Sequence, residues 1–298
     1  MGKAIVICGA TASGKTALSV ALAKQLRTEI ISADSMLVYQ GLNIGTAKPT
    51  EEEKDKVPHH LIDVVSPFNC FSVSDYEAMA LPIVERLLAE GKTPIICGGT
   101  GFYIQSLLYK SQFGNAGADE RLREELEALL KDKGKEYLHN LLREKDPESA
   151  AILHLNDTKR VMRALEIFLL TGKKKSEQKD ERIPRFEFVC VSVDFPRERL
   201  YERINLRVEE MFKAGLKEEV QSLLNGGVTP DLQCMQGIGY KEVAEGLLSG
   251  QTEEEMKELV KKNTRNYAKR QLTFFKRMEN HTPLPPERAS VREVLKLL

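Results

Sequence analysis

The chain has 298 residues and a formal net charge of zero, and 42% of its residues are apolar. This length suits one large domain or two modest ones, and the apolar content is enough for a buried core. Zero net charge gives no global argument for a polyanionic partner, so charge has to be examined segment by segment. No stretch approaches the roughly 18 apolar residues of a membrane helix, which excludes a membrane-spanning protein.

The apolar run at residues 4–8 is too short for the core of a signal peptide, so we expect a cytoplasmic protein. The five cysteines form no CxxC pair. Three of them, Cys8, Cys97 and Cys190, lie in apolar runs typical of buried strands. We therefore expect packed thiols instead of disulfides or metal ligands.

Strands and helices alternate along the first hundred residues. Short apolar runs predict strands at residues 3–8, 29–33, 60–65 and 94–97, and helical periods occupy residues 16–27, 74–90 and 102–109. A fifth strand is predicted at residues 186–193. Such alternation indicates an α/β fold with a parallel sheet covered on both faces. The sequence is then helical to about residue 278, and residues 283–287 break the pattern before a short terminal helix.

The fourth and fifth predicted strands are separated by far more residues than an ordinary crossover needs. Residues 119–131 and 156–171 in this gap carry clear helical periods. We therefore expect an all-α insertion domain at residues 114–184. Residues 1–113 and 185–298 would form a P-loop NTPase-like parallel sheet core with C-terminal helices.

A phosphate-binding loop follows the first strand at once. The pattern G-x-x-x-x-G-K-T between a buried strand and a helix is typical of a Walker A loop. Its backbone N–H groups and the helix N-terminus favour bound phosphate, Lys15 adds a full charge, and the hydroxyl of Thr16 can bind Mg²⁺. ATP, GTP and a prenyl pyrophosphate would all fit. The loop consists of Gly9, Ala10, Thr11, Ala12, Ser13, Gly14, Lys15 and Thr16.

Polar residues end the second and fourth predicted strands. Asp34 should face the same crevice as the P-loop, since ligands gather at the carboxyl ends of parallel strands. There it can accept a proton from a nucleophile, help to hold Mg²⁺, or cap the next turn. Thr100 is expected to cap the helix that follows it, with a ligand role left open. His59, His60 and Asp63 are interpreted as structural residues.

Two helices carry basic faces despite the neutral total. Residues 257–277 hold eight Lys or Arg and one Glu, and Lys262, Arg265, Lys269 and Lys276 share one helical face. In the insertion, Lys159, Arg160 and Arg163 begin a helix. These could be solvated faces, but two basic helices in a neutral chain favour contact with a nucleic-acid backbone.

The chain resembles the tRNA dimethylallyltransferases, also called tRNA isopentenylpyrophosphate transferases. The resemblance covers residues 4–277 in order and is carried by the following segments: 9–16, 34–39 (Asp-Ser-Met-Leu-Val-Tyr), 45–49 (Gly-Thr-Ala-Lys-Pro), 58–63 (Pro-His-His-Leu-Ile-Asp), 98–103 (Gly-Gly-Thr-Gly-Phe-Tyr), 156–173, 237–241 (Gly-Ile-Gly-Tyr-Lys) and 269–273 (Lys-Arg-Gln-Leu-Thr). Leu37, Gln40 and Phe274 stand where Gln, a basic residue and Trp are common in that family.

The resemblance implies transfer of a dimethylallyl group to N6 of the adenosine 3′ of the anticodon, in tRNAs that read U-initial codons. It further implies dimethylallyl diphosphate on the P-loop, Mg²⁺ near Thr16, a catalytic role for Lys15, Asp34 as general base, and Thr100 as a residue that positions the reacting groups. The family also implies a monomer. The implied tRNA contacts are Asp34, Ser35, Met36, Leu37, Thr100, Arg123, Lys159, Arg160, Val161, Met162, Arg163, Gln236, Gly237, Ile238, Gly239, Tyr240, Lys241, Lys269, Arg270, Gln271, Thr273 and Lys276.

Three alternative functions share the P-loop. An adenylate isopentenyltransferase would act on free AMP, ADP or ATP, but it would need neither the insertion nor the basic C-terminal helix. A small-molecule kinase fits the P-loop and Asp34 equally well. A P-loop RNA-binding switch would bind RNA in a nucleotide-dependent way without altering it. Charge and spacing alone do not identify the prenyl donor or the tRNAs that are modified.

Overall fold

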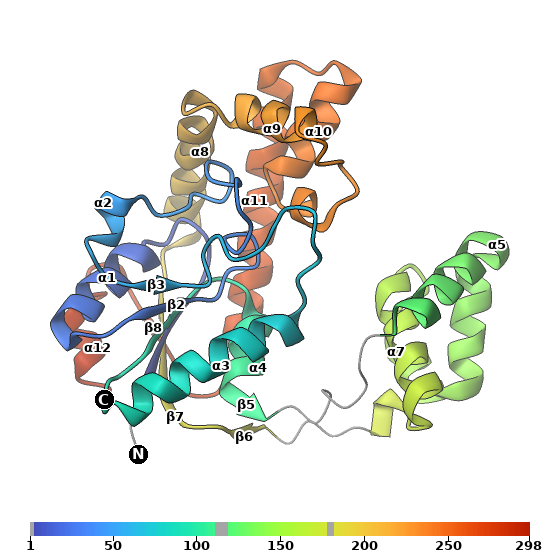
Figure 1. Cartoon of the computed structure of the whole chain (residues 1–298), viewed down its shortest axis with the longest axis horizontal. Helices are drawn as coiled ribbons and strands as arrows, with labels where there is room; N and C mark the ends of the chain where they lie inside the picture. Colours follow the sequence, from blue (N-terminus) through green and yellow to red (C-terminus); the bar gives the residue numbers. More distant parts are fainter. Residues whose placement is uncertain (1–2, 111–118, 178–181) are drawn as a thin grey trace. The chain divides into compact units, whose positions relative to one another are not determined.

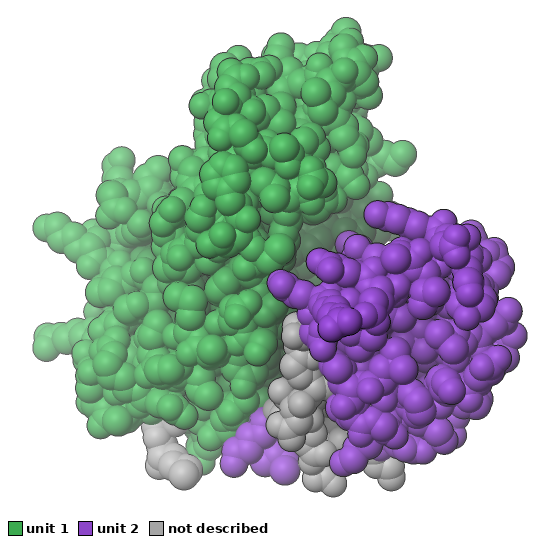
Figure 2. Space-filling view, turned by 45° about the vertical axis from the view of Figure 1, so that its right-hand side comes forward, with its two compact units in different colours: residues 1–109, 184–298 green, residues 110–183 purple. Residues whose placement is uncertain are grey.

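The computed structural model describes residues 3–110, 119–177 and 182–298, and the chain forms two compact units. The first unit, which we call the core, consists of Met1–Tyr109 and Pro184–Leu298, and the second, the insertion, of Lys110–Ile183 (Figure 2). The chain leaves the core and returns to it through two paired two-residue strands, β5 (Tyr109–Lys110) and β6 (Ile183–Pro184). The start predicted for the insertion, residue 114, lies outside the described residues.

A parallel sheet organises the core, as the sequence predicts. Within the described residues its strand order is β3-β2-β4-β1-β7-β8, and each recorded pairing between neighbours is parallel (Figure 1). The first strand is therefore interior, with β4 on one side and β7 on the other. The strands are β1 (Lys3–Cys8), β2 (Ile30–Ser32), β3 (His59–His60), β4 (Ile95–Cys97), β7 (Glu187–Val193) and β8 (His281–Leu284).

Alternate residues of the strands supply two separate apolar clusters. Val6 and Cys8 belong to a cluster with residues of α3 (Val73–Ala89) and α4 (Gly101–Leu108). Ile5 and Ile7 belong to a second cluster with residues of α1 (Lys15–Leu26) and α12 (Val291–Leu295). Because successive side chains of a strand point to opposite faces, the sheet is covered on both sides.

The third predicted strand, residues 60–65, is mostly wrong. Only His59 and His60 pair with β2, and Val65 returns as an isolated bridge to Tyr39. Leu61 and Asp63 have φ angles of 61° and 57°, in the left-handed region, which an extended strand does not tolerate. The apolar run therefore reflects a loop, in which Leu61 and Val65 are buried while Asp63 and Val64 are exposed.

The last strand, β8, was not predicted, because Pro283 was interpreted as a break in structure. It lies at the edge of the sheet beside β7. An edge strand tolerates proline, since its missing N–H is not needed by a second neighbour. Short helices α2 (Glu51–Lys54) and α6 (Pro147–Ile152) also escaped prediction.

The C-terminal part of the core is helical, as expected, but it is divided into several elements. Between β7 and β8 lie α8 (Arg197–Lys213), α9 (Leu216–Asn225), a 3₁₀ turn η3 (Gln233–Gln236), α10 (Tyr240–Ser249) and α11 (Glu253–Phe275). Helix α11 contacts both α8 and α4, which brings the C-terminal helices against the loops at the carboxyl ends of the strands.

The insertion is helical in the part that the structure describes. Its elements are α5 (Glu120–Lys145), which is kinked at Gly134, then α6, α7 (Thr158–Thr171) and the 3₁₀ turn η2 (Lys175–Glu177). Leucines of α5 and α7 share an apolar cluster of their own. The insertion thus has a small core independent of the sheet. None of the helices in the described ranges combines the length and apolar character that a membrane crossing requires.

Two buried carboxylates hold the insertion together. Asp146 is fully buried and accepts hydrogen bonds from Ser149 N (3.1 Å), Ser176 N (3.0 Å) and Ser176 Oγ (2.6 Å). Burial alone would raise the pKa of this carboxyl, but the serine hydrogen bonds outweigh it and lower the pKa to about 2. Glu166 is 2% exposed and binds Arg123 at 2.8 Å and Arg163 at 2.6 Å.

Candidate functional site

The P-loop residues 9–16 connect β1 to α1, as the sequence predicts. Gly9 and Gly14 have φ angles of 126° and 85°, which side chains disfavour, so glycine is required for this turn. Ala12 also has a positive φ, 60°, and is thus a strained position. The turn directs the N-terminus of α1 toward the carboxyl edge of the sheet, which is the arrangement that binds phosphate.

Lys15 begins α1, and its Nζ donates a hydrogen bond to Ala10 O at 2.5 Å. Burial lowers the pKa of Lys15, partly opposed by Cys97 and Asp34, while the nearby positive charge of Arg207 lowers it further. A lysine that is short of negative partners favours an anionic ligand. Thr16, the next residue, is exposed and lines the same cavity.

Asp34 follows β2 and lies at the carboxyl edge, as expected. Its Oδ1 accepts a hydrogen bond from Met36 N at 2.9 Å, which fixes the carboxylate on the turn. Thr100 occupies the N-cap position of α4 but makes no side-chain cap, contrary to expectation. Its Oγ1 instead accepts from Ser35 N at 2.9 Å and lies 3.3 Å from Ser35 Oγ. The hydroxyl therefore ties the turn after β2 to the turn after β4.

Helix α11 contributes two side chains that face inward. Gln271 is 5% exposed; it accepts from Thr11 N at 2.9 Å and donates to Gly99 O at 3.0 Å. Its amide thus bridges the P-loop and the loop after β4. Burial and the charge of Asp34 raise the pKa of Tyr267 to about 12, so the phenol remains protonated at neutral pH.

Two arginines of α8 complete the basic surroundings, and sequence reasoning missed both. Arg203 Nε donates to Ala12 O at 2.8 Å, and Arg207 lines the cavity beside Lys15 and Asp34. Burial lowers the pKa of Arg207, with Asp34 opposing that shift. The two residues are four apart on one helix, but the helix carries further charges, and nothing in its sequence shows which of them face inward.

Lys15, Thr16, Asp34, Arg207, Tyr267 and Gln271 all line one cavity of about 110 Å³. Its floor holds the hydroxyl of Ser32 and Nε2 of His59, buried atoms for which the described part of the chain provides no hydrogen-bond partner. His59 was interpreted as purely structural, and its Nδ1 does bond to Val57 O at 2.8 Å. The lining residues are Thr11, Lys15, Thr16, Ser19, Ile30, Ser32, Asp34, Leu37, Thr46, Ala47, Pro49, His59, Ile62, Cys97, Gly98, Gly99, Arg207, Tyr267 and Gln271.

The oxygen donors that line the cavity fit Mg²⁺. Across the described ranges no three His, Cys, Asp or Glu side chains gather into a metal cluster. The Thr16 hydroxyl and the Asp34 carboxylate do line the cavity, and both are oxygen donors. Mg²⁺ typically uses one or two such ligands together with substrate phosphates, so these residues fit it.

The predicted tRNA-binding residues fall into exposed and buried groups. On α11, Lys269, Arg270, Thr273 and Lys276 are exposed. Gln236 and Lys241 are exposed, Ile238 is half-buried, and Gly237 and Gly239 are buried. Tyr240 is fully buried. Ser35, Met36 and Leu37 are half-buried beside the cavity.

The insertion's predicted contacts divide in the same way. Lys159 and Arg160 are exposed, and Arg160 pairs with Asp157. Met162 is half-buried, and Val161, at 1% exposed, belongs to the apolar cluster. Arg123 and Arg163 serve first as partners of Glu166.

Several known proteins are similar to this chain. Residues 37–278 match the family model of the IPP transferases. A tRNA dimethylallyltransferase of Acetivibrio thermocellus is 46% identical over 283 residues, with 94% of this chain and 90% of that protein covered. The crystal structure of a full-length tRNA isopentenylpyrophosphate transferase from Bacillus halodurans is 41% identical, with a TM-score of 0.74 and coverage of 100% and 94%. A eukaryotic dimethylallyltransferase acting on tRNA is 30% identical, with a TM-score of 0.84 and coverage of 96% and 74%.

Proposed function

This chain belongs to the IPP transferase family and is a prenyl-transferring enzyme, and we propose that it transfers a dimethylallyl group from dimethylallyl diphosphate to N6 of the adenosine 3′ of the anticodon. The acceptors are tRNAs that read U-initial codons, and the second product is diphosphate. The observation that carries the proposal is the common cavity that Lys15 of the P-loop and Arg207 of α8 line together with the carboxylate of Asp34.

The diphosphate of the donor binds to the P-loop amides and the N-terminus of α1. Lys15 and Arg207 provide positive charge where negative charge develops on the leaving group. Thr16 would hold Mg²⁺, which would further neutralise the diphosphate when it is bound. The apolar lining residues Ile30, Leu37 and Ile62 suit the branched hydrocarbon.

Asp34 is the general base. The adenine N6 forms a bond to the allylic carbon, the bond between that carbon and the diphosphate oxygen breaks, and the amine proton passes to the carboxylate. Because Met36 N occupies Oδ1, we assign Oδ2 as the proton acceptor. A positioned base typically contributes about 10²–10⁴-fold. Thr100 and Ser35 hold the turn that carries Asp34.

The tRNA is bound by exposed basic residues. Lys269, Arg270 and Lys276 of α11 contact phosphates of the anticodon arm, and Lys159 and Arg160 extend the contact onto the insertion. The adenosine has to leave the stack of the anticodon loop, at a cost of about a few kcal/mol. Phosphate contacts offset this cost.

The decisive experiment offers labelled dimethylallyl diphosphate to an unmodified tRNA and, in parallel, to free AMP. We expect the label on tRNA, at the adenosine 3′ of the anticodon. Label on AMP alone would move the protein to the adenylate isopentenyltransferases. No transfer to either acceptor by folded protein with Mg²⁺ would refute prenylation, and phosphate transfer from ATP would then favour a kinase.

A further inference from the structure

One wall of the cavity is a loop whose role in the reaction is unassigned. Residues 43–49, which we call the wall loop, contribute Thr46, Ala47 and Pro49 to the cavity lining. Thr46 Oγ1 bonds back to Leu42 O at 2.8 Å, and Ala47 has a φ of 48°, in the left-handed region. A residue other than glycine keeps such a conformation only when its surroundings hold it there.

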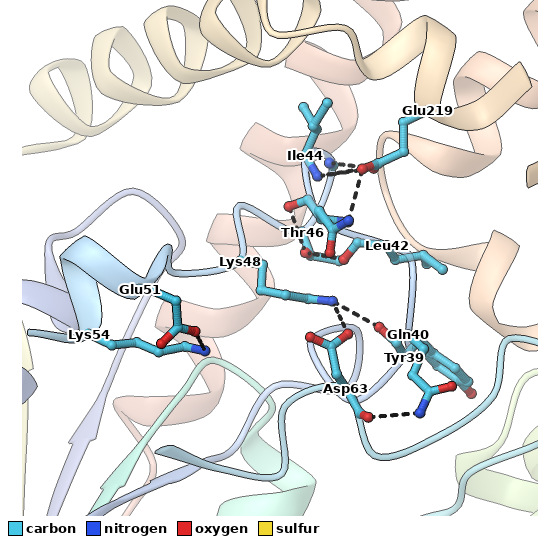
Figure 3. Close-up of polar contacts among 12 residues, drawn as sticks. Tyr39, Gln40, Leu42, Ile44, Thr46, Lys48, Glu51, Lys54, Asp63 and Glu219 are labelled. Atoms are coloured by element: carbon cyan, nitrogen blue, oxygen red, sulfur yellow. Dashed lines mark hydrogen bonds and ion pairs between the residues drawn. The ribbon is translucent and has the colours of Figure 1, made fainter. Parts of the chain in front are cut away.

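Glu219, on α9, holds the first half of the wall loop (Figure 3). Its carboxylate accepts hydrogen bonds from three consecutive backbone N–H groups, those of Asn43 at 3.1 Å, Ile44 at 3.0 Å and Gly45 at 3.4 Å. Charge-assisted hydrogen bonds of this kind are about twice as strong as neutral ones. A single side chain therefore fixes three residues of the loop.

Tyr240 completes this contact from α10. Its hydroxyl donates to Glu219 Oε1 at 2.6 Å and accepts from Gly45 N at 3.1 Å. Burial, followed by the charge of Glu219, raises the pKa of Tyr240, so the donor proton stays in place at all physiological pH values. A Cβ on Gly45 would lie 2.5 Å from the Tyr240 ring, so only glycine admits the ring here.

The second half of the wall loop is held from another direction. Lys48 is largely buried, and its Nζ donates to Tyr39 O at 3.0 Å and pairs with the carboxylate of Asp63 (Figure 3). Thr46 and Ala47, two of the three cavity-lining residues of the wall loop, thus lie between two anchored points. These contacts, all within the chain, hold the wall loop on both sides of the two residues.

We propose that Glu219 is a positioning residue for the prenyl donor, acting through the wall loop with Tyr240 as its partner. The proposal rests on the proposed function, since it assumes that the donor occupies this cavity. Glu219 does not line the cavity, and its effect on the donor passes through Thr46 and Ala47. When the wall is held in place before the donor arrives, less conformational entropy is lost on donor binding. Loss of Glu219 should therefore weaken donor binding more than it slows chemistry.

The test compares Glu219→Ala, Glu219→Gln and Tyr240→Phe with Glu218→Gln, an exposed neighbour on the same helix. Glu219→Ala is expected to raise the donor KM about tenfold or more, because several charge-assisted hydrogen bonds are lost. The value of kcat and the affinity for tRNA should change less than about twofold. Glu219→Gln keeps one acceptor oxygen and should give an intermediate KM, and Glu218→Gln should match the wild type.

A double variant provides the second readout. Glu219→Ala combined with Tyr240→Phe should raise the donor KM no further than Glu219→Ala alone, since both residues act on the same loop. An unchanged donor KM in Glu219→Ala overturns the proposal. So does a parallel loss of melting temperature, kcat and tRNA affinity in both Glu219 variants, which would indicate a structural role. Wild-type transfer to tRNA is measured in the same assay, so a failure of the proposed function itself is seen separately.

Discussion

Asp34 is the single residue on which the proposed chemistry depends most directly. Asparagine at this position keeps an oxygen for the Met36 N–H but cannot accept the amine proton. We expect Asp34→Asn to lower kcat about 10²–10⁴-fold while leaving tRNA affinity unchanged. Single-turnover transfer and a filter-binding assay measure the two quantities. Equal losses in both would make Asp34 a binding residue and not the base.

Lys15 gives a prediction that depends on pH. Burial lowers its pKa below the usual 10.5, so it loses its positive charge at a lower pH than an ordinary lysine does. Because the charged form binds diphosphate, the donor kcat/KM should fall as pH rises through this lowered pKa. Arginine stays charged, and Lys15→Arg should lack this alkaline limb even if its activity is lower. A limb that persists in Lys15→Arg would assign the titration to another group.

Residue-scale prediction from sequence succeeded where a motif fixes the backbone. The P-loop, Asp34 and Thr100 follow strands directly, so the sheet itself brings them to one edge. Arg207, Tyr267 and Glu219 were missed, because each lies on a helix whose inward face is set by tertiary packing. The buried Gln271, Tyr240 and Val161 show the converse: membership of a motif does not tell which side of a helix faces solvent.

Among the elements, the short helix α6 and the turn η2 depend on the buried carboxylate of Asp146. Its pKa is about 2 in the folded chain against an ordinary 3.8, so its charge stabilises the insertion above about pH 4 and loses that effect toward pH 2. We expect Asp146→Asn to cost about 2 kcal/mol at neutral pH and little at pH 2.

Hydrogen exchange in the full chain measures this cost locally, through the protection of residues 147–176. The exposed Asp132→Asn on α5 serves as the control and should leave protection unchanged. Suppose instead that Asp146→Asn leaves this protection unchanged at both pH values. The negative charge of Asp146 would then contribute nothing, and its hydrogen bonds with the serines alone would account for the stability of this segment.

Element-scale prediction was best where an apolar period is long, as in α3 and α7, and poorest where backbone conformation overrides composition. Leu61 and Asp63 interrupt an apolar run with left-handed dihedrals, and no residue type there signals it. Edge strand β8 was not predicted, because Pro283 was interpreted as a break in the structure. In both cases the position of the segment in the sheet decides the outcome, and that position is a property of the assembled core.

The whole molecule is electrically neutral but presents a basic face on α11. Removing two of its exposed lysines with Lys269→Ala and Lys276→Ala should weaken tRNA binding and reduce the slope of log affinity against log salt by roughly 1 for each lysine. Lys296→Ala, at the residue that follows α12, should change neither tRNA affinity nor this slope. If the affinity of the wild-type protein for tRNA does not vary between low and moderate salt, phosphate contacts are excluded as the basis of tRNA binding.

The place of β1 in the sheet has a consequence for how the chain folds during synthesis. This first strand pairs with β7, whose residues emerge from the ribosome only after the whole insertion, and β8 follows later still. Until then one flank of β1 carries unpaired backbone groups, which invite association with other chains. An insertion that folds early, on its own apolar cluster, would shorten the effective loop that β1 and β7 must close. The insertion would then assist the assembly of the core in addition to any part it takes in binding tRNA.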